Sequence, residues 1–542
     1  MESCLAQDIV FNILTYLNKS DSFNFLNTSS FMASNKHLLY NKYIFNYEKI
    51  KKYYGNSSNY DSYKNLIKIL KVNDQYNFNL LKFNNLHTLK IFDHKTNYKK
   101  YYKKGNNKIR FNNLPQLLET LDLNCDFDQH LNTLPKQLKN LTIKTSTFDK
   151  PINKLPYGLK SLHMTVREFN KSLNHLPNYL ESLTLISFDF NQEYGINLNG
   201  CKFNKKLDNL PKYLKTLHIY SPEFNQPLNN LPQTIETLAI HSLEFNQDIN
   251  NLSVNLKSLE IKANKFNKQI KFPIYLEKFM FEGNMDKTLM NSLPENLKFL
   301  EMINNEFNQQ INNLPKYLET IILKINNYNQ LLNNFPDNLS NLIFESAIFN
   351  QVIDQLPKYL YKLEITVHKF NQPLNNLPNT LTILNINSLL FNQNIDNLPK
   401  SLKTLILNIV SFNKKINLLY LSKLNTLVIK AYIFNKSLNN LPPTLKEIFF
   451  ESDKYNKSLN LTYITSLISL DLNIYHYNKD LDHLPNSLNK LYFHSVSFNK
   501  KINLDYLNQL NELRLRINDN KIIKKLPSSL NLNNITMSKY LC

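Results

Sequence analysis

Residues 377–397 read Leu-Pro-Asn-Thr-Leu-Thr-Ile-Leu-Asn-Ile-Asn-Ser-Leu-Leu-Phe-Asn-Gln-Asn-Ile-Asp-Asn, and variants of this unit recur from about residue 111 to the end of the 542-residue sequence. A repeat of about 20 to 30 residues is typical of a solenoid, because one unit cannot bury its apolar face alone and must stack on its neighbours. The sequence therefore predicts that about four-fifths of the chain forms one elongated, right-handed repeat domain.

The aromatic residue of each Phe-Asn pair gives the period of the repeat. An interval of 34 residues separates Phe169 from Phe203, which predicts a loop over 190–202 that bulges from one turn. Ser253 and Tyr420 stand where proline is usual, so we expect those turns to be present but less regular. The uninterrupted series has steps of 21 residues and two steps of 22: Phe307, Tyr328, Phe349, Phe370, Phe391, Phe412, Phe434, Tyr455, Tyr477 and Phe498.

The segment Leu-x-x-Leu-x-Ile within each unit ends in alternating apolar and polar residues, which is typical of a short strand. Leu402, Leu405 and Leu407 are an example. Parallel stacking of such strands hides these side chains inside the turn and leaves the residues between them on an open face. About twenty strands at about 4.8 Å each give a stack about 95 Å long, in which Leu384 points inward.

Asparagine takes the place of glycine in this sequence, which has only 6 glycines. Because asparagine tolerates left-handed turn conformations, we expect the Asn-Asn pair before Leu-Pro to make the turns that glycine makes elsewhere. The asparagine after the aromatic residue recurs in ten successive units, from Asn308 to Asn499. This regularity predicts a ladder of side-chain hydrogen bonds that satisfies backbone groups between turns.

The unit resembles the leucine-rich repeat superfamily and, more narrowly, the FNIP-repeat proteins, whose signature is Phe-Asn-x-x-Leu-x-x-Leu-Pro-x-x-Leu-x-x-Leu-x-Ile. The match covers about 430 residues in some eighteen copies. The fold that it implies is an α/β-type solenoid dominated by a parallel β-sheet, with leucine-rich-repeat-like turns of about 21 residues and a small N-terminal α-helical cap. We place the solenoid at residues 83–542.

Residues 1–45 have a helical rather than strand-like spacing of apolar residues. Two interpretations remain open: an amphipathic cap that closes the end of the solenoid, or an F-box, the helical motif that docks onto the Skp-type adaptor of cullin-RING ubiquitin ligases. Residues 46–82 are predicted as a helical linker, with a helix over 61–71. The F-box resemblance assigns adaptor contacts to Leu5, Ile9, Ile13, Leu14, Leu17 and Phe23.

The combined resemblance implies a substrate-recruiting adaptor of an SCF-type ubiquitin ligase, in which the F-box docks the Skp-type adaptor and the repeats hold a target protein. FNIP-repeat proteins are known chiefly from amoebae and from large DNA viruses that infect them, which implies a viral adaptor that redirects host degradation. The alternative is a non-catalytic repeat scaffold for protein–protein interaction with no link to ubiquitin. A basic solenoid that binds nucleic acid is a weaker alternative.

The formal net charge of +21 comes almost entirely from lysine, in a chain whose overuse of Lys, Asn, Ile, Tyr and Phe is typical of AT-rich coding sequence. The charge alone is therefore weak support for nucleic-acid binding. One local pattern exceeds this bias, because the residue after Phe-Asn is glutamine in five successive units and lysine in the next five. The glutamines are Gln309, Gln330, Gln351, Gln372 and Gln393. The lysines are predicted to form a ridge of like charge on the side away from the strands: Lys414, Lys436, Lys457, Lys479 and Lys500.

No catalytic motif is present, so we expect neither an enzyme nor a cofactor. His163, His218 and His241 fall at outward strand positions, but without a cysteine or carboxylate cluster they do not predict a metal site. Four scattered cysteines predict no disulfide framework, and no apolar stretch is long enough to span a membrane. With no signal peptide either, we expect an intracellular protein of the cytoplasm, or of the host cytoplasm if viral, with no membrane or small-molecule partner.

The target-binding residues are predicted toward the C-terminal end. Arg514 and Arg516 alternate with leucines in one predicted strand, so both should point outward, and Phe449 and Tyr492 fall at outward positions of earlier turns. Arginine with exposed aromatic residues is the usual composition of an interface hot spot. We therefore predict that these four residues bind the target protein. The alternative is that they only cap a fraying end.

Overall fold

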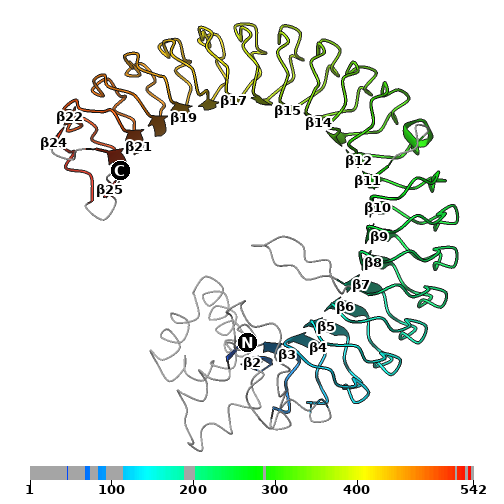
Figure 1. Cartoon of the computed structure of the whole chain (residues 1–542). Coiled ribbons are helices and arrows are strands. Elements are labelled where there is room, and N and C mark those ends of the chain that lie inside the picture. The colour runs from blue at the N-terminus through cyan, green and yellow to red at the C-terminus, as the bar shows by residue number, and fades with distance from the viewer. Residues whose placement is uncertain are drawn as a thin grey trace, which may run out of the picture. The chain divides into compact units, whose positions relative to one another are not determined.

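The computed structural model describes residues 45–46, 68–73, 83–92, 111, 114–187, 202–284, 289–518, 522–531 and 535–538. The chain divides into two compact units, residues 1–273 (unit 1) and 274–542 (unit 2). In both units each turn of the chain contributes one short strand (Figure 1). The protein is a parallel β-solenoid of about twenty turns with repeats of about 21 residues, which confirms the leucine-rich-repeat-like architecture expected from the sequence.

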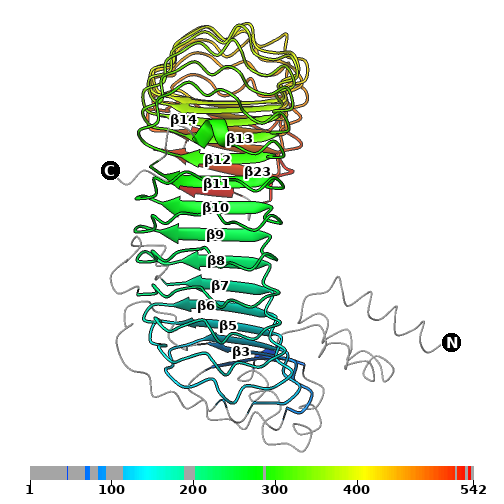
Figure 2. The same cartoon turned by 90° about the vertical axis from the view of Figure 1, so that its right-hand side faces the viewer.

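In unit 1 each strand pairs in parallel, and in register, with the strand of the next turn. Figure 2 shows these strands as a ladder whose arrows all point the same way. The strands are β1 (Phe45–Asn46), β2 (Ile69–Asn73), β3 (Thr88–Phe92), β4 (Thr120–Asn124), β5 (Asn140–Thr145), β6 (Ser161–Val166), β7 (Ser182–Ile186), β8 (Thr216–Tyr220), β9 (Thr237–Ser242) and β10 (Ser258–Ala263).

Unit 2 repeats this pairing from β11 to β21 and on to β23 and β25, while β22 and β24 form a separate two-stranded parallel sheet in the last turns. One 3-10 helix, η3 (Leu289–Ser292), precedes β12. The strands are β11 (Lys278–Gly283), β12 (Phe299–Ile303), β13 (Thr320–Lys324), β14 (Asn341–Ser346), β15 (Lys362–Val367), β16 (Ile383–Ser388), β17 (Thr404–Ile409), β18 (Thr426–Lys430), β19 (Glu447–Ser452), β20 (Ser469–Ile474), β21 (Lys490–Ser495), β22 (Ile502–Asn503), β23 (Glu512–Ile517), β24 (Ile523–Lys525) and β25 (Ile535–Ser538).

The strands form because apolar residues alternate with polar ones, so that one side faces the interior of the turn and the other faces outward. In β16, Leu384 and Ile386 are buried, whereas Asn385 between them is partly exposed. This is the alternation expected of a sheet with one buried face. Leu384 is fully buried, which confirms its predicted inward position. Each such leucine contributes about 1.5–3 kcal/mol when removed from water.

The Leu-Pro segment makes the bend that leads the chain back into the strand. The carbonyl oxygen of Pro399 accepts a hydrogen bond from the backbone N–H of Leu402 at 3.1 Å. Proline suits this position because it has a fixed φ and no N–H that needs a partner. Where Ser253 replaces proline, its carbonyl accepts the same bond from Leu256 at 3.1 Å. The bend is therefore a property of the backbone and persists without proline.

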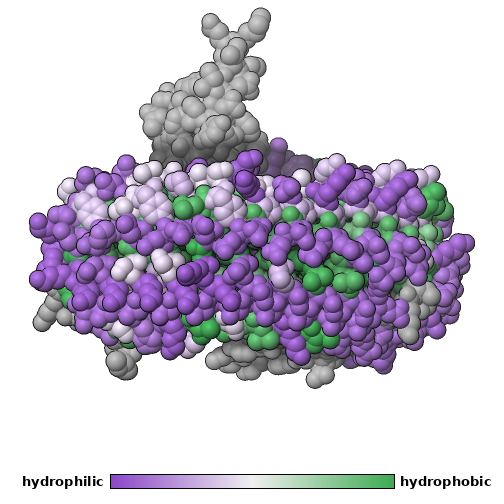
Figure 3. Space-filling model, turned by 90° about the horizontal axis from the view of Figure 1, so that it is seen from above, coloured by the Kyte–Doolittle hydropathy of each residue, from purple (hydrophilic) through white to green (hydrophobic). Residues whose placement is uncertain are grey.

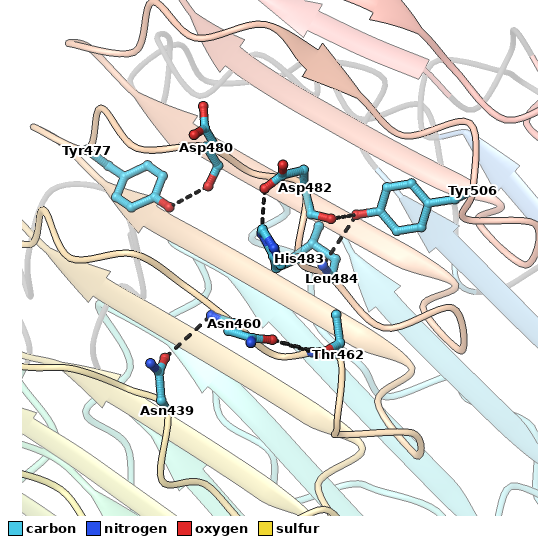
Figure 4. Close-up of polar contacts among 9 residues, drawn as sticks. All are labelled: Asn439, Asn460, Thr462, Tyr477, Asp480, Asp482, His483, Leu484 and Tyr506. Carbon is cyan, nitrogen blue, oxygen red and sulfur yellow. Dashed lines mark hydrogen bonds and ion pairs between the residues drawn. The ribbon is translucent and has the colours of Figure 1, made fainter.

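Three turns replace the Leu-Pro bend by a segment that contains a tyrosine, at Tyr420, Tyr463 and Tyr506, spaced 43 residues apart. In each, the tyrosine hydroxyl reaches back to the preceding turn. The Tyr506 hydroxyl donates to the carbonyl oxygen of Asp482 at 2.8 Å and accepts from the backbone N–H of Leu484 at 3.3 Å (Figure 4). These turns are 22 rather than 21 residues long, and their tyrosine hydroxyls connect each of them to the preceding turn.

The aromatic residues of the Phe-Asn pairs form a buried column, stacked nearly face to face between turns. In unit 2 the ring centroids of Phe412 and Phe434 are 5.8 Å apart, and those of Tyr328 and Phe349 are 6.4 Å apart. In unit 1 the Phe224 and Phe245 rings are 6.0 Å apart. Paired strands are only about 4.8 Å apart. Successive turns therefore splay at the aromatic column, and the strands of each unit line its inner side (Figure 1).

The predicted asparagine ladder is confirmed. In unit 2 the Oδ1 atom of each asparagine accepts the backbone N–H of its counterpart one turn later, as Asn371 does from Asn392 at 2.9 Å, in nine successive steps from Asn308 to Asn499. In unit 1 the Asn204 N–H donates to Asn170 at 3.2 Å, so the ladder continues past the 34-residue interval. The predicted loop over 190–202 falls almost wholly outside the described residues.

The turn-forming role expected of the Asn-Asn pairs holds in two turns. Asn313 and Asn334 both have a φ of 58°, the left-handed conformation. Among the described non-glycine residues no others have a positive φ. In the other described turns the same bend is therefore made with negative φ, and the scarcity of glycine is consistent with turns that need few left-handed residues.

Upstream of residue 83 the structure corrects the predicted helical linker. Residues 69–71, the end of the helix expected over 61–71, belong to β2, which pairs in parallel with β3. The reason is local: Leu70 and Val72 are buried while Lys71 between them is exposed, and this alternation by two is that of a strand. The predicted helical segment at 1–45 lies outside the described residues, except for β1. Among the described residues no helix is long and apolar enough to cross a membrane.

Candidate protein-binding surface

The residues predicted to bind the target lie together on the outward strand face near the end of unit 2. Phe449 of β19 pairs with Asp471 of β20, Asp471 pairs with Tyr492 of β21, and Tyr492 pairs with Arg514 of β23. Arg514 is exposed and the other three are half-buried. The register thus places two aromatic rings, a carboxylate and a guanidinium in one row across four strands.

Arg514 is held in position by two neighbours. Its guanidinium carbon lies 4.6 Å from the centroid of the Tyr492 ring, and its Nη2 donates to Oε1 of Glu512 at 2.7 Å. Burial, with the charge of Glu512 beside it, raises the pKa of Tyr492, so its hydroxyl stays protonated. A guanidinium that is already stacked loses little further freedom when it binds a carboxylate of a partner.

Phe449 is flanked in the same way at the other end of the row. The Nζ atom of Lys430, on β18, lies 5.1 Å from the centroid of the Phe449 ring. Each aromatic ring of the row therefore has a cation over one side, and Asp471 lies between the two rings. Cations bind aromatic faces by attraction to the electron density of the ring, at about 0.5–2 kcal/mol each.

Asp471 is the electrostatically unfavourable member of the row. Burial raises its pKa, the charge of Glu451 adds to this effect, and Arg514 and Lys430 oppose it. Its ionised form is therefore less stable in the folded protein than in water. Such a group reduces the stability of the protein alone, and a cation supplied from outside would relieve it.

A second row follows two residues further along the same strands. Glu451, Asn473, His494 and Arg516 pair in register, and Nδ1 of His494 lies at hydrogen-bond distance from Oδ1 of Asn473. Burial, together with the charge of Arg516, lowers the pKa of His494 and keeps the ring neutral at neutral pH. The C-terminal strand surface consists of these two rows: Phe449, Asp471, Tyr492 and Arg514, with Glu451, Asn473, His494 and Arg516.

All four predicted target contacts therefore lie on one surface, although their role stays a prediction. The six predicted adaptor contacts lie outside the described residues. Sequence reasoning missed Asp471, Lys430 and His494. The repeat spacing could have identified two of them, because Asp471 lies 22 residues after Phe449 and His494 lies 22 residues before Arg516, which is one turn in each case. A search for aromatic and arginine residues alone passes over the polar side chains in the same row.

Unit 1 carries a separate cluster on its outward strand face, built from His218, Tyr220, His241 and Glu260. The Tyr220 ring stacks on His218, with centroids 5.8 Å apart, and on His241 at 4.1 Å. Nε2 of His241 lies 2.8 Å from Oε1 of Glu260, and this contact, helped by Lys262, lowers the pKa of Glu260 to about 2. The cluster is thus a set of internal contacts on this part of the sheet face.

The histidines at outward strand positions are occupied by these contacts. Burial lowers the pKa of His218 and of His163, so both rings are neutral at neutral pH. Oγ1 of Thr165 lies 3.3 Å from Nε2 of His163. Over the described ranges no group of three or more His, Cys, Asp or Glu side chains is arranged to hold a metal ion.

The repeat is also found in known proteins. Residues 203–243 match the family described as FNIP Repeat. No curated protein matches the chain. A solved structure described as CroV588, a novel circular LRR protein, is 28% identical and has a TM-score of 0.65, and the match covers 87% of this chain and 72% of that one.

Two more distant solved structures also match. YopM from Yersinia enterocolitica WA-314 is 19% identical, with 78% of this chain and 88% of that one covered and a TM-score of 0.43. TLR13 in its complex with ssRNA13 is 14% identical, with 87% and 80% covered and a TM-score of 0.46. At these scores the two likenesses carry no argument. The chain is thus a leucine-rich-repeat-like solenoid that carries the FNIP repeat at residues 203–243.

Proposed function

We propose that this chain is a non-enzymatic scaffold that captures a partner protein on the C-terminal strand surface. The observation that carries the proposal is Asp471, whose charged form is disfavoured where it lies, between Phe449 and Tyr492. Residues that reduce stability are typical of functional sites. A lysine or arginine of the partner would neutralise Asp471 and contact the two aromatic rings, while Arg514 would pair with a carboxylate of the same partner.

The test is a substitution that removes the charge of Asp471 and keeps the size and shape of its side chain. Asp471→Asn should abolish partner capture while the melting temperature at pH 7 stays equal or rises, because the unfavourable ionised group is gone. Arg514→Ala with Arg516→Ala should weaken capture of the same protein, with only the small drop in melting temperature expected from losing the exposed pair with Glu512 and the cation over Tyr492.

The matched control is Glu364→Gln. Glu364 lies on β15 in the same outward register position, five turns away from Asp471, and the substitution makes the same chemical change. Proteins retained from a host-cell extract are compared by quantitative mass spectrometry for the wild type and the three variants. A protein lost in both surface variants and retained by Glu364→Gln is the target. If all variants retain the same proteins, the C-terminal strand surface is not the binding site.

The narrower proposal is that the scaffold is the substrate-recruiting adaptor of an SCF-type ubiquitin ligase. It is supported by the resemblance of residues 1–45 to an F-box, and by a repeat region that provides a long open face for a target. The residues that would bury their side chains against the Skp-type adaptor are Leu5, Ile9, Ile13, Leu14, Leu17 and Phe23.

Replacing Leu5, Ile9 and Leu14 by serine separates this proposal from its alternative. We expect loss of the adaptor in co-purification while the circular dichroism of the strands is unchanged. Adaptor binding that persists would leave the scaffold without a ubiquitin link. Loss of the strand signal would show that these residues close the end of the solenoid.

A further inference from the structure

In each turn, the residue directly after the ladder asparagine or aspartate belongs to a second column, here called the outer column. Where this residue is glutamine, it makes a hydrogen bond to the preceding turn in most cases. Its Nε2 donates to the Oδ1 of the ladder asparagine in the preceding turn, at 3.1 Å for Gln393 and Asn371. The amide thus strengthens the ladder from the outer side. The same bond, at 2.9–3.3 Å, is made by Gln226, Gln247, Gln330, Gln351 and Gln372.

Lysine at this position is paired with a carboxylate in two turns of unit 1. The ladder residues there are Asp128 and Asp149, and the lysine one turn later forms an ion pair with each: Nζ of Lys150 lies 2.9 Å from Oδ2 of Asp128, and Nζ of Lys171 lies 2.7 Å from Oδ2 of Asp149. Where the ladder residue is an aspartate, the lysine one turn later therefore pairs with it, whereas Lys205 and Lys268 follow the neutral Asn170 and Asn246. Glutamine is matched to asparagine by the same geometry.

Five successive turns of unit 2 carry lysine at this position without such a pair. Their ladder residues are all neutral asparagines, yet the outer column carries lysine. All five lysines are exposed, and among the described residues no carboxylate forms an ion pair with any of them. The Lys ridge consists of Lys414, Lys436, Lys457, Lys479 and Lys500.

The Lys ridge is a continuous row of like charge, with one lysine per turn. The neighbouring aromatic column has steps of 5.8, 6.2, 6.1 and 6.2 Å over these turns, which makes the ridge about 24 Å long at that level. Five lysines on successive turns, whose aromatic rings are about 6 Å apart, repel one another, and the glutamine bonds made in earlier turns are absent. Among the described residues no ion pair balances the charge of this row, and an anionic partner would neutralise it.

The flanking residues do not cancel the charge. The residue after each ridge lysine is Lys415, Ser437, Ser458, Asp480 or Lys501, so one carboxylate stands against two further lysines. A second carboxylate nearby, Asp482, has its Oδ1 2.6 Å from Nδ1 of His483 (Figure 4). The outer face seen from above is a series of hydrophilic bands with hydrophobic residues between them (Figure 3).

We infer that the Lys ridge binds an acidic polypeptide segment in extended conformation, on the opposite side of the turns from the C-terminal strand surface. An extended chain advances about 3.4 Å per residue and repeats its side chains on one face every two residues, about 6.8 Å. This is close to the step of the ridge, so about nine residues with Glu or Asp at every second position present one carboxylate to each of the five lysines.

The composition of the ridge favours protein over nucleic acid. Proteins that bind single strands combine a positive groove with exposed aromatic rings on which bases stack. Here the adjacent aromatic column is fully buried, and the ridge has no arginine, the residue best suited to phosphate. Lysine, a flexible point charge, suits carboxylates presented in a row.

The test uses the full chain and a fluorescein-labelled peptide of ten glutamates, followed by fluorescence anisotropy at low and high salt. Changing all five ridge lysines to glutamine should weaken binding by at least about tenfold at low salt. Each new glutamine has an asparagine in the preceding turn, as Gln393 has, so the melting temperature should not fall. Conversely, Gln351→Lys with Gln372→Lys and Gln393→Lys lengthens the ridge to eight lysines and should tighten binding and steepen its salt dependence.

The control removes the same number of charges elsewhere in unit 2. Lys358, Lys400, Lys403, Lys423 and Lys446 are exposed and lie off the ridge, and changing them to glutamine should leave the affinity within about twofold of the wild type. Equal losses in both variants would overturn the inference in favour of net charge alone. Tighter ridge-dependent binding of a ten-residue oligothymidylate, or of vesicles containing phosphatidylserine, would overturn the assignment to a polypeptide.

Discussion

Replacing Asn371 by alanine should lower the free energy of unfolding by about 1–3 kcal/mol. The Oδ1 atom of Asn371 accepts two hydrogen bonds, from the backbone N–H of Asn392 at 2.9 Å and from Nε2 of Gln393 at 3.1 Å. The Gln393 amide is near the surface and can turn to water. The Asn392 N–H is fixed in the backbone and part-buried, so its lost partner dominates the cost.

Asn371→Asp is the matched variant, because it keeps an acceptor oxygen in the same place. Unit 1 contains this arrangement naturally, with Asp149 accepting the backbone N–H of Asn170 at 3.2 Å. We expect this variant to lie within about 0.5 kcal/mol of the wild type. Adding Gln393→Lys should restore any loss, since it recreates the pair of Asp149 with Lys171.

Urea unfolding followed by circular dichroism measures both free energies, and hydrogen exchange of the Asn392 amide reports on the bond itself. The alanine variant should exchange this amide faster and the aspartate variant should not. Equal destabilisation by alanine and aspartate would refute the reasoning, because the acceptor oxygen would then not be the cause. A loss below about 0.5 kcal/mol with alanine would show that the ladder adds nothing to stability.

Further predictions concern the core, the cluster of unit 1 and the tyrosine bridges. Leu384→Ala should cost about 2–5 kcal/mol in urea unfolding, and a loss below about 1 kcal/mol would contradict its inward position. The pKa of Glu260 is lowered to about 2, so its contribution is complete above about pH 4.5 and is lost as the pH falls toward 2. Glu260→Gln should therefore lose stability mainly at neutral pH, by at most about 3 kcal/mol, and the difference from the wild type should shrink in acid. Tyr506→Phe leaves the Leu484 N–H without its bond and should lower the melting temperature, at a cost of about 0.5–1.5 kcal/mol; an unchanged melting temperature would mean that water replaces the hydroxyl.

The architecture could be predicted from the sequence because every turn has the same pattern of apolar residues and must bury them in the same way. The inward position of Leu384 and the asparagine ladder follow from spacing alone, since a period of 21 residues places identical side chains next to each other in successive turns. The helix expected over 61–71 failed at its end for the opposite reason. A short segment with Leu66, Ile67 and Leu70 fits a helical spacing as well as the alternation of a strand, and only the pairing of β2 with β3 decides between them.

The candidate surface was only partly accessible. Periodicity identifies which residues share a row, and it placed Phe449, Tyr492 and Arg514 correctly on the outward face. It does not give the stacking of Arg514 on Tyr492 or the raised pKa of Asp471, because both depend on side-chain conformation and local burial. The sequence alone could not show that the positive charge of the Lys ridge is uncompensated. This becomes visible only when the structure shows the hydrogen bonds of glutamine and the ion pairs of Lys150 and Lys171 at the same position of the turn.

The splaying of turns at the aromatic column has a mechanical consequence. The strand side of each unit is held by several backbone hydrogen bonds per turn, whereas the aromatic side is held by the asparagine ladder and by ring contacts at separations of 5.8 to 6.4 Å in unit 2. We therefore expect each unit to bend as a beam whose neutral axis runs through the sheet. Bending compresses or stretches the soft stack of rings and leaves the length of the strand face unchanged, so the face can change its curvature to fit a partner while its rows of side chains keep their register.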